Sequence, residues 1–303
     1  MTTTIDLLTG GNRGTLLPAN VTNEIWGQTF EESVVAKLSG TKAITIAGEA
    51  APVVTKRPSA QIGGESQPKS ATEFELGAKT MQILKAHVGF PLSWETVLAN
   101  PAGALDIIRD EFASAIARQI DLAVIHGRNA ADGSQISSVS EYLSQATNAV
   151  EVPDNNAEID AAIFDGASLL ARGARYNGLA VDDKFSTRLA GARDSQGRRI
   201  YPEVSLGGGL SSFSGVTLAA SPAVSGAVDG STETDVLAVG GDWNSLTFGK
   251  AAEITFKTIE YGDPFGTGDL QNLNQIGVRS EIIFGYSIRD LDAFVKYTSP
   301  AGE

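Results

Sequence analysis

The sequence contains no cysteine and only two histidines, His87 and His126. Disulfides and thiolate chemistry are therefore excluded, and two histidines without an HExxH pattern do not make a histidine-rich metal site. No run of 18 apolar residues is present, which excludes a membrane-spanning helix, and the first residues form no signal segment. These absences predict a protein without metal, cofactor or membrane, and they fit assembly in the cytoplasm.

Basic residues are also few, because 23 Lys and Arg stand against 36 Asp and Glu, giving a net charge of −13. A long DNA interface needs Lys and Arg to neutralise phosphates, so we expect at most loose contact with nucleic acid. The sequence has no GxxxxGKS/T loop, no strand-associated GxGxxG and no GxSxG elbow. It therefore predicts a protein that is not an enzyme.

One long amphipathic helix is predicted over about residues 100–126. Asn100 is a favourable N-cap residue, and Pro101 suits the first helical position. Apolar residues recur three or four apart, at Leu105, Ile108, Phe112, Ile116, Ile120 and Val124. Gly127 is placed to end the helix, where His126 is expected to act as a cation that favours the dipole. At roughly 39 Å, this helix is long enough to be the spine of a domain.

A long hairpin is predicted before this helix, over residues 41–91. Its outgoing arm runs over 42–56, and its returning arm begins where Phe74 and Leu76 alternate with Glu73 and Glu75. The intervening residues 57–70 are mostly Gly, Pro, Ser, Gln and Lys, which are typical of turns and linkers. An isolated hairpin is only marginally stable in water. We therefore interpret it either as a surface loop or as an arm that becomes ordered against another subunit.

The charges are distributed unevenly along the chain. Residues 172–199 hold seven basic and three acidic residues, a local net charge of +4, whereas residues 229–303 hold twelve acidic and five basic residues, a net of −7. Opposite patches on one chain suit head-to-tail contacts between copies. The same residues could also be solvated faces without a partner, and the sequence leaves both interpretations open.

The remaining pattern mixes helices and strands. Helices are predicted over 158–172 and 185–192, and strands over 179–181, 216–218, 236–239, 253–259, 276–286 and 294–297. This mixed order predicts an α+β fold without internal repeats.

The order of several short motifs resembles the tailed-phage major capsid proteins of the Hong Kong 97 fold. The motifs are LPA at 17–19, EESVVAKL at 31–38, VGFPLSWE at 88–95, QIDLAVIHG at 119–127, GVTL at 215–218, GGDW at 240–243, NQIGVRSE at 274–281, GY at 285–286 and AFV at 293–295. Their common order and spacing carry the resemblance over nearly the whole chain.

The resemblance implies an α+β capsid fold in four parts. These are an N-terminal arm and helix at 1–40, an extended hairpin loop at 41–91, a peripheral domain with the spine helix at 92–140 and 249–303, and an axial domain at 141–248. Hexamers and pentamers of the chain would close into an icosahedral shell in the host bacterial cytoplasm and enclose double-stranded DNA.

The partners that the resemblance implies are other copies of the chain and a portal protein. The arm motif begins within the first 20 residues, so we expect a separate scaffold protein or none, and decoration proteins are possible. DNA would be contacted only loosely. No metal, cofactor or membrane is expected.

Two sets of residues are predicted to act between subunits. The first makes noncovalent contacts: Lys56, Arg57, Gln61, Glu65, Lys69, Arg188, Arg193, Arg198 and Arg199. The second follows a Lys–Asn isopeptide crosslink known in some relatives, with Asn274 as acceptor, Glu281 as base and Lys79 as the best-placed amine. That base would need a raised pKa, and ordinary structural roles explain Asn274 and Glu281 equally well, so we expect no crosslink.

Two other classes of protein stay open. A bacterial encapsulin shell shares the fold and would enclose cargo protein, although no cargo-docking signal is evident. A soluble hydrolase is the enzyme alternative, but the sequence offers neither a catalytic triad nor a set of metal ligands.

Overall fold

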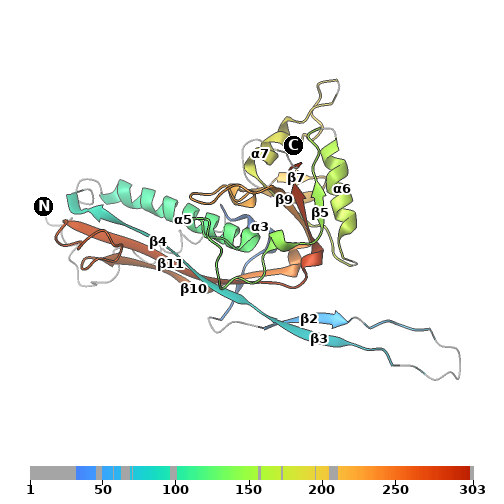
Figure 1. Ribbon diagram of the computed structural model, residues 1–303, viewed down its shortest axis with the longest axis horizontal. Helices are drawn as coiled ribbons and strands as arrows, with labels where there is room; N and C mark the ends of the chain where they lie inside the picture. The colour runs from blue at the N-terminus through green and yellow to red at the C-terminus, as the bar shows by residue number, and fades with distance from the viewer. Residues whose placement is uncertain are drawn as a thin grey trace.

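The computed structural model describes residues 32–45, 50–56, 58–62, 69, 71–95, 101–155, 158–171, 173–194, 196–204 and 211–300. Two β-sheets, a long helix and a projecting hairpin make up this part of the chain (Figure 1). The predicted N-terminal arm and the N-cap residue Asn100 lie outside the described residues. Within them, no helix is long and apolar enough to cross a membrane.

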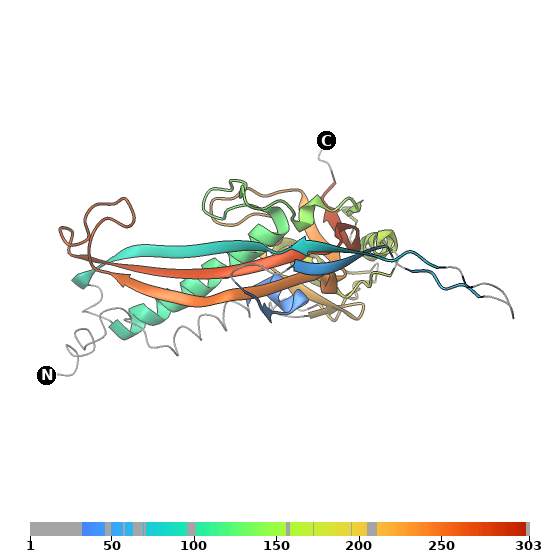
Figure 2. The same cartoon turned by 90° about the horizontal axis from the view of Figure 1, so that it is seen from below.

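A four-stranded sheet and the spine helix α5 (Pro101–His126) form the elongated half of the molecule (Figure 2). The strand order is β1 (Lys42–Ala43), β10 (Leu246–Ile259), β11 (Gln275–Ile288) and β4 (Gln82–Ser93). The predicted apolar stripe of α5 is buried at Ile108, Phe112, Ile116, Ile120 and Val124.

The helix packs on the sheet through aromatic contacts, and its end follows the predicted pattern. The rings of Phe90 and Phe112 meet edge to face with centroids 5.4 Å apart. The helix ends at Gly127, whose φ of 68° lies in the left-handed region that glycine adopts without strain. The long helix predicted from periodicity is therefore confirmed.

The hairpin is shorter than predicted. Strands β2 (Ala50–Lys56) and β3 (Glu75–Thr80) pair in antiparallel fashion and project away from both sheets (Figures 1 and 2). The next strand, β4, pairs with β11 along its whole length, from Gln82↔Tyr286 to Ser93↔Gln275. Residues 82–91 therefore belong to the four-stranded sheet, which corrects the predicted extent of 41–91 for the hairpin.

A six-stranded sheet forms the second half. Its order is β5 (Ala149–Glu151), β12 (Phe294–Thr298), β9 (Val236–Gly241), β6 (Gly178–Val181), β8 (Val216–Ala220) and β7 (Ser211–Phe213). Strand β12 pairs with β5 and β9. Residues 294–298 thus lie in the sheet of the axial part, which corrects the expectation that 249–303 belong wholly to the peripheral domain.

Two helices pack on one face of this sheet. Helix α6 (Ile159–Leu169) buries Ile159 and Ile163 in a core that also holds Leu179 and Val295 of the strands. Helix α7 (Asp183–Gly191) begins two residues earlier than predicted, because the Asp182 carboxylate accepts a hydrogen bond from the Lys184 N–H at 2.9 Å.

The two sheets share one apolar core. The cluster around α5 contains Ile282 and Phe284 of the four-stranded sheet together with Val239 and Phe294 of the six-stranded sheet. The short helix α3 (Val34–Ser39) contacts α5, β6, β8 and β10 at this junction. The halves are therefore joined by continuous packing.

Candidate assembly surfaces

The base of the hairpin is fastened to the body by Lys79 and Gln82. The Lys79 Nζ lies 2.8 Å from a Glu141 carboxylate oxygen and donates to the Ile288 carbonyl at 3.0 Å. The Gln82 amide donates to the Glu141 carbonyl at 3.0 Å and accepts from the Ser140 N–H at 2.8 Å. These contacts fix the direction in which β2 and β3 leave the body.

The hairpin carries exposed apolar side chains. Phe74 is 52% exposed, Leu76 is 62% exposed, and Val54 and Ile62 are exposed as well. An apolar side chain that leaves water contributes about 25 cal/mol per Å², and large exposed apolar groups mark interaction surfaces when they occur together. The hairpin is therefore suited to being covered by another protein surface.

The charged residues predicted on the hairpin have varied surroundings. Lys56, at the end of β2, forms an ion pair with Glu73, which precedes β3, and both side chains are more than half exposed. Such exposed pairs contribute little to stability. Gln61 and Lys69 are exposed, whereas Arg57 and Glu65 lie outside the described residues.

The predicted basic residues gather after helix α7, although Arg188 differs from the others. Its guanidinium is half-buried and donates to the Pro153 carbonyl, so it fastens the segment before α6. Arg193, Arg198 and Arg199 are exposed on a tight loop that we call the 193–199 loop. Its ends meet through a bridge between Arg193 and Arg199.

The crosslink candidates have structural partners within the chain. Lys79 pairs with Glu141 as described above, and the Asn274 amide donates to Glu95 at 2.6 Å. Glu281 lies 2.9 Å from both Lys85 and Arg279, and the hydrogen bond from Lys85 is the main cause that lowers the pKa of its carboxyl. A general base would need a raised pKa, so this arrangement disfavours the role.

The proposed acceptor Asn274 and the proposed base Glu281 also lie far apart within one chain. Asn274 directly precedes β11, and Glu281 lies near its middle. At about 3.4 Å per residue, the seven-residue separation places the two residues roughly 24 Å apart. They cannot act together on one bond unless a second chain supplies one of them.

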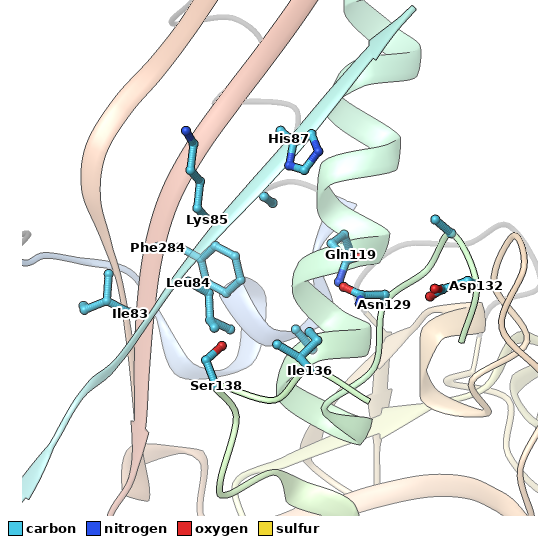
Figure 3. Close-up of a pocket in the computed structure, with 13 residues that line it drawn as sticks. Ile83, Leu84, Lys85, His87, Gln119, Asn129, Asp132, Ile136, Ser138 and Phe284 are labelled. Atoms are coloured by element: carbon cyan, nitrogen blue, oxygen red, sulfur yellow. The ribbon is translucent and has the colours of Figure 1, made fainter. Parts of the chain in front are cut away.

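A hollow of about 410 Å³ lies between β4, α5 and the loop that follows α5. Lys85 and His87 extend from β4 on one side, and Asn129 and Asp132 lie on the other (Figure 3). Among the residues that the structure describes, no group of three His, Cys, Asp or Glu side chains is placed to hold a metal ion.

The sequence pattern of the phage capsid family matches residues 13–299. The chain belongs to the phage capsid family. Proteins of this family form the capsid of the virion from many copies, so the role of the family is structural. The Hong Kong 97 fold expected from the resemblance is confirmed.

Three relatives show how closely the chain follows phage capsid proteins. The probable major capsid protein gp17 of Mycobacterium phage D29 is 26% identical over 287 residues, which cover 91% of this chain and 87% of gp17. A chain in the structure of Gordonia phage Cozz is 43% identical with a TM-score of 0.78, covering 95% of this chain and 92% of that one. Mycobacterium phage Ogopogo gives 29% identity and a TM-score of 0.76, covering 89% and 92%.

Sequence analysis did not identify the structural role of Asp121. It lies on α5, is 1% exposed, and accepts hydrogen bonds from the Ser33 hydroxyl at 2.7 Å, the Val34 N–H at 3.0 Å and the Val35 N–H at 3.1 Å. It thereby anchors the first turn of α3, whose N–H groups have no partner within the helix. Burial raises the pKa of Asp121 to about 6, although these hydrogen bonds lower it.

His126 also departs from its predicted role as a cation. It is buried, and its Nε2 donates to the Val224 carbonyl at 2.8 Å. Burial is the main cause that lowers the pKa of its imidazole. The side chain is therefore neutral near pH 7 and joins the end of α5 to the short helix at Pro222–Val224.

Because Lys79, Asn274 and Glu281 have partners within the chain, we expect capsids of this protein to dissociate fully in hot SDS. Electrophoresis should give a single band near 31.6 kDa. A ladder of heavier bands that disappears in an Asn274→Ala variant would show that the crosslink forms.

Proposed function

We propose that this chain is the major capsid protein of a tailed bacteriophage, and that hexamers and pentamers of it close into an icosahedral shell around double-stranded DNA. The observation that carries this proposal is the projecting hairpin with Phe74 and Leu76 exposed. A projecting hairpin gains stability when a neighbouring copy covers it. The membership in the phage capsid family supports the same role.

Each part of the fold would have its own role in the shell. The four-stranded sheet with α5 would form the peripheral domain, the six-stranded sheet with α6 and α7 the axial domain, and β2 and β3 the extended loop. Residues 1–40 would supply the N-terminal arm and its helix α3. Because a closed shell makes every subunit multivalent, modest single interfaces suffice for a stable particle. Release of one subunit requires many contacts to break together, which gives kinetic stability.

The further partners follow from the same proposal. A portal protein would be one partner, and separate scaffold and decoration proteins are compatible with the proposal. The acidic net charge supports loose contact with packaged DNA. Assembly would take place in the host bacterial cytoplasm, without metal, cofactor or catalytic activity. The relatives described above come from phages, and none of the observations favours an encapsulin or a hydrolase.

Expression of the full chain tests the proposal. We expect light scattering after size exclusion to report assemblies of hexamer mass or larger, and negative-stain microscopy to show closed shells. A chain that stays monomeric across the salt and pH conditions in which phage particles are stable would contradict the capsid role.

A further inference from the structure

Acidic and basic residues of the axial half are separated along the chain. Between Arg128 and Arg172 there is no Lys or Arg, whereas seven Asp and Glu occur there. The next stretch, which includes α7 and the 193–199 loop, holds the basic residues. Helix α6 thus belongs entirely to the acidic stretch.

The outward face of α6 combines acidic and apolar side chains. Its inward face buries Ile159 and Ile163 against the sheet. Outward, Phe164 is 60% exposed and Leu169 is 49% exposed, with Glu158 and Asp165 exposed beside them. A large aromatic residue with a charged rim is the usual composition of a protein contact site.

Hydrogen bonds within the 193–199 loop hold Arg193 and Arg198, and the Arg198 guanidinium pairs with Asp194 at 3.2 Å. One Asp194 carboxylate oxygen accepts from the Gln196 N–H at 2.8 Å and the Arg198 N–H at 2.9 Å, while the Arg193 guanidinium donates to the Gly197 carbonyl at 2.9 Å. These bonds hold Arg193 and Arg198 in place before any partner arrives, which lowers the entropy cost of binding.

Helices α6 and α7 pack on the same face of the six-stranded sheet, and Tyr201, which follows the 193–199 loop, is buried in the core that they share. The outward face of α6 and the 193–199 loop are two separate exposed surfaces of the same half of the molecule. A surface that meets a different surface of the next copy makes a head-to-tail contact, which generates a ring when the rotation closes.

We propose that the outward face of α6, centred on Phe164 and edged by Glu158 and Asp165, binds the 193–199 loop of the neighbouring copy. This rests on the proposed capsid function and names the two surfaces of one contact within a capsomer. The opposite charges set the register and speed of the encounter. Phe164 and Leu169 lose water in the contact and supply its apolar centre.

Charge reversal on each surface tests this contact. The acid-reversed variant carries Glu158→Arg and Asp165→Arg, and the base-reversed variant carries Arg198→Glu and Arg199→Glu. Each variant alone places like charges opposite each other, so the assembled fraction at about 50 mM salt is expected to fall about tenfold. The difference in assembled fraction between each variant and the natural chain becomes smaller as salt rises, because salt screens the repulsion between the like charges.

The matched control carries all four substitutions in one chain. Its net charge equals that of the natural chain, and the reversed α6 again meets a loop of opposite charge. Shells are expected to return to near the natural yield. Melting temperatures of the unassembled variants identify any loss of assembly that comes from misfolding.

Mixing the two reversed variants gives a sharper result. Only alternating neighbours are attractive in the mixture, so a ring must contain an even number of subunits. Hexamers are expected to form, whereas pentamers, which cannot alternate, are not, and closed shells stay absent. Native mass spectrometry distinguishes the two rings.

Two outcomes overturn the inference. One is assembly of either folded reversed variant at the yield of the natural chain, and the other is a folded four-substitution chain that stays unassembled. If these occur while the natural chain forms shells, only this contact is wrong. If the natural chain also stays monomeric, the proposed capsid function fails together with it.

Discussion

Deletion of residues 61–70 is expected to abolish shell formation while the subunit stays folded. The deleted residues lie beyond the paired strands β2 and β3, and the exposed Ile62 packs on nothing within the described chain. Lys79 and Gln82 continue to fasten the hairpin base. Loop tips of this kind contribute little to stability, so the free energy of unfolding should change by about 1 kcal/mol or less.

Urea unfolding of the unassembled subunit measures its stability, and negative-stain microscopy shows whether shells form. Replacement of the same ten residues by a Gly/Ser linker is the matched control, because it keeps the length and removes the side chains. If the linker variant forms shells and the deletion does not, the length of the loop is what assembly requires. Normal shells from the deletion would show that the tip does not link neighbouring subunits.

The elements that sequence reasoning predicted well are those with local signals. The stripe from Ile108 to Val124 repeats every three or four residues, and Gly127 ends the helix through its own backbone conformation. Strand β4 has no such signal for its partner. Its alternation is compatible with a hairpin arm or with a sheet strand, and only its pairing with the distant β11 decides between them.

The candidate site was predicted less completely, because partners far apart in sequence determine what a charged residue does. Lys79 lies among apolar neighbours in the sequence, yet in the fold it meets Glu141 and the carbonyl of Ile288. Asp121 looks like an ordinary polar residue of an amphipathic helix. Its role depends on α3, which begins 87 residues before it.

Asp121→Ala is expected to destabilise the unassembled subunit by roughly 3 kcal/mol, because the Ser33 hydroxyl and the Val34 and Val35 N–H groups lose their acceptor while they stay buried. Amide hydrogen exchange at Val34 and Val35 should accelerate more than exchange in the centre of α5. A variant in which both amides stay protected would show that Asp121 does not anchor α3.

The pH dependence separates the charge of Asp121 from its hydrogen bonds. Its pKa is raised from 3.8 to about 6 on folding, so the folded state binds more protons between these values, and the contribution to stability falls as pH rises through that window. Compared with Asp121→Asn, which does not titrate, the natural chain should lose about 2 kcal/mol of relative stability between about pH 4.5 and 7.5. Urea unfolding at both pH values measures this difference.

Glu281→Gln is the control of opposite sign. The pKa of Glu281 is lowered on folding, mainly by the hydrogen bond from Lys85, so its contribution is present above the unfolded pKa and is lost as pH falls through the folded one. The stability of the natural chain relative to Glu281→Gln should therefore increase with pH, whereas relative to Asp121→Asn it should decrease. If the relative stability increased with pH in both comparisons, burial would not raise the pKa of Asp121. Asp121 would then cap α3 as an ionised carboxylate.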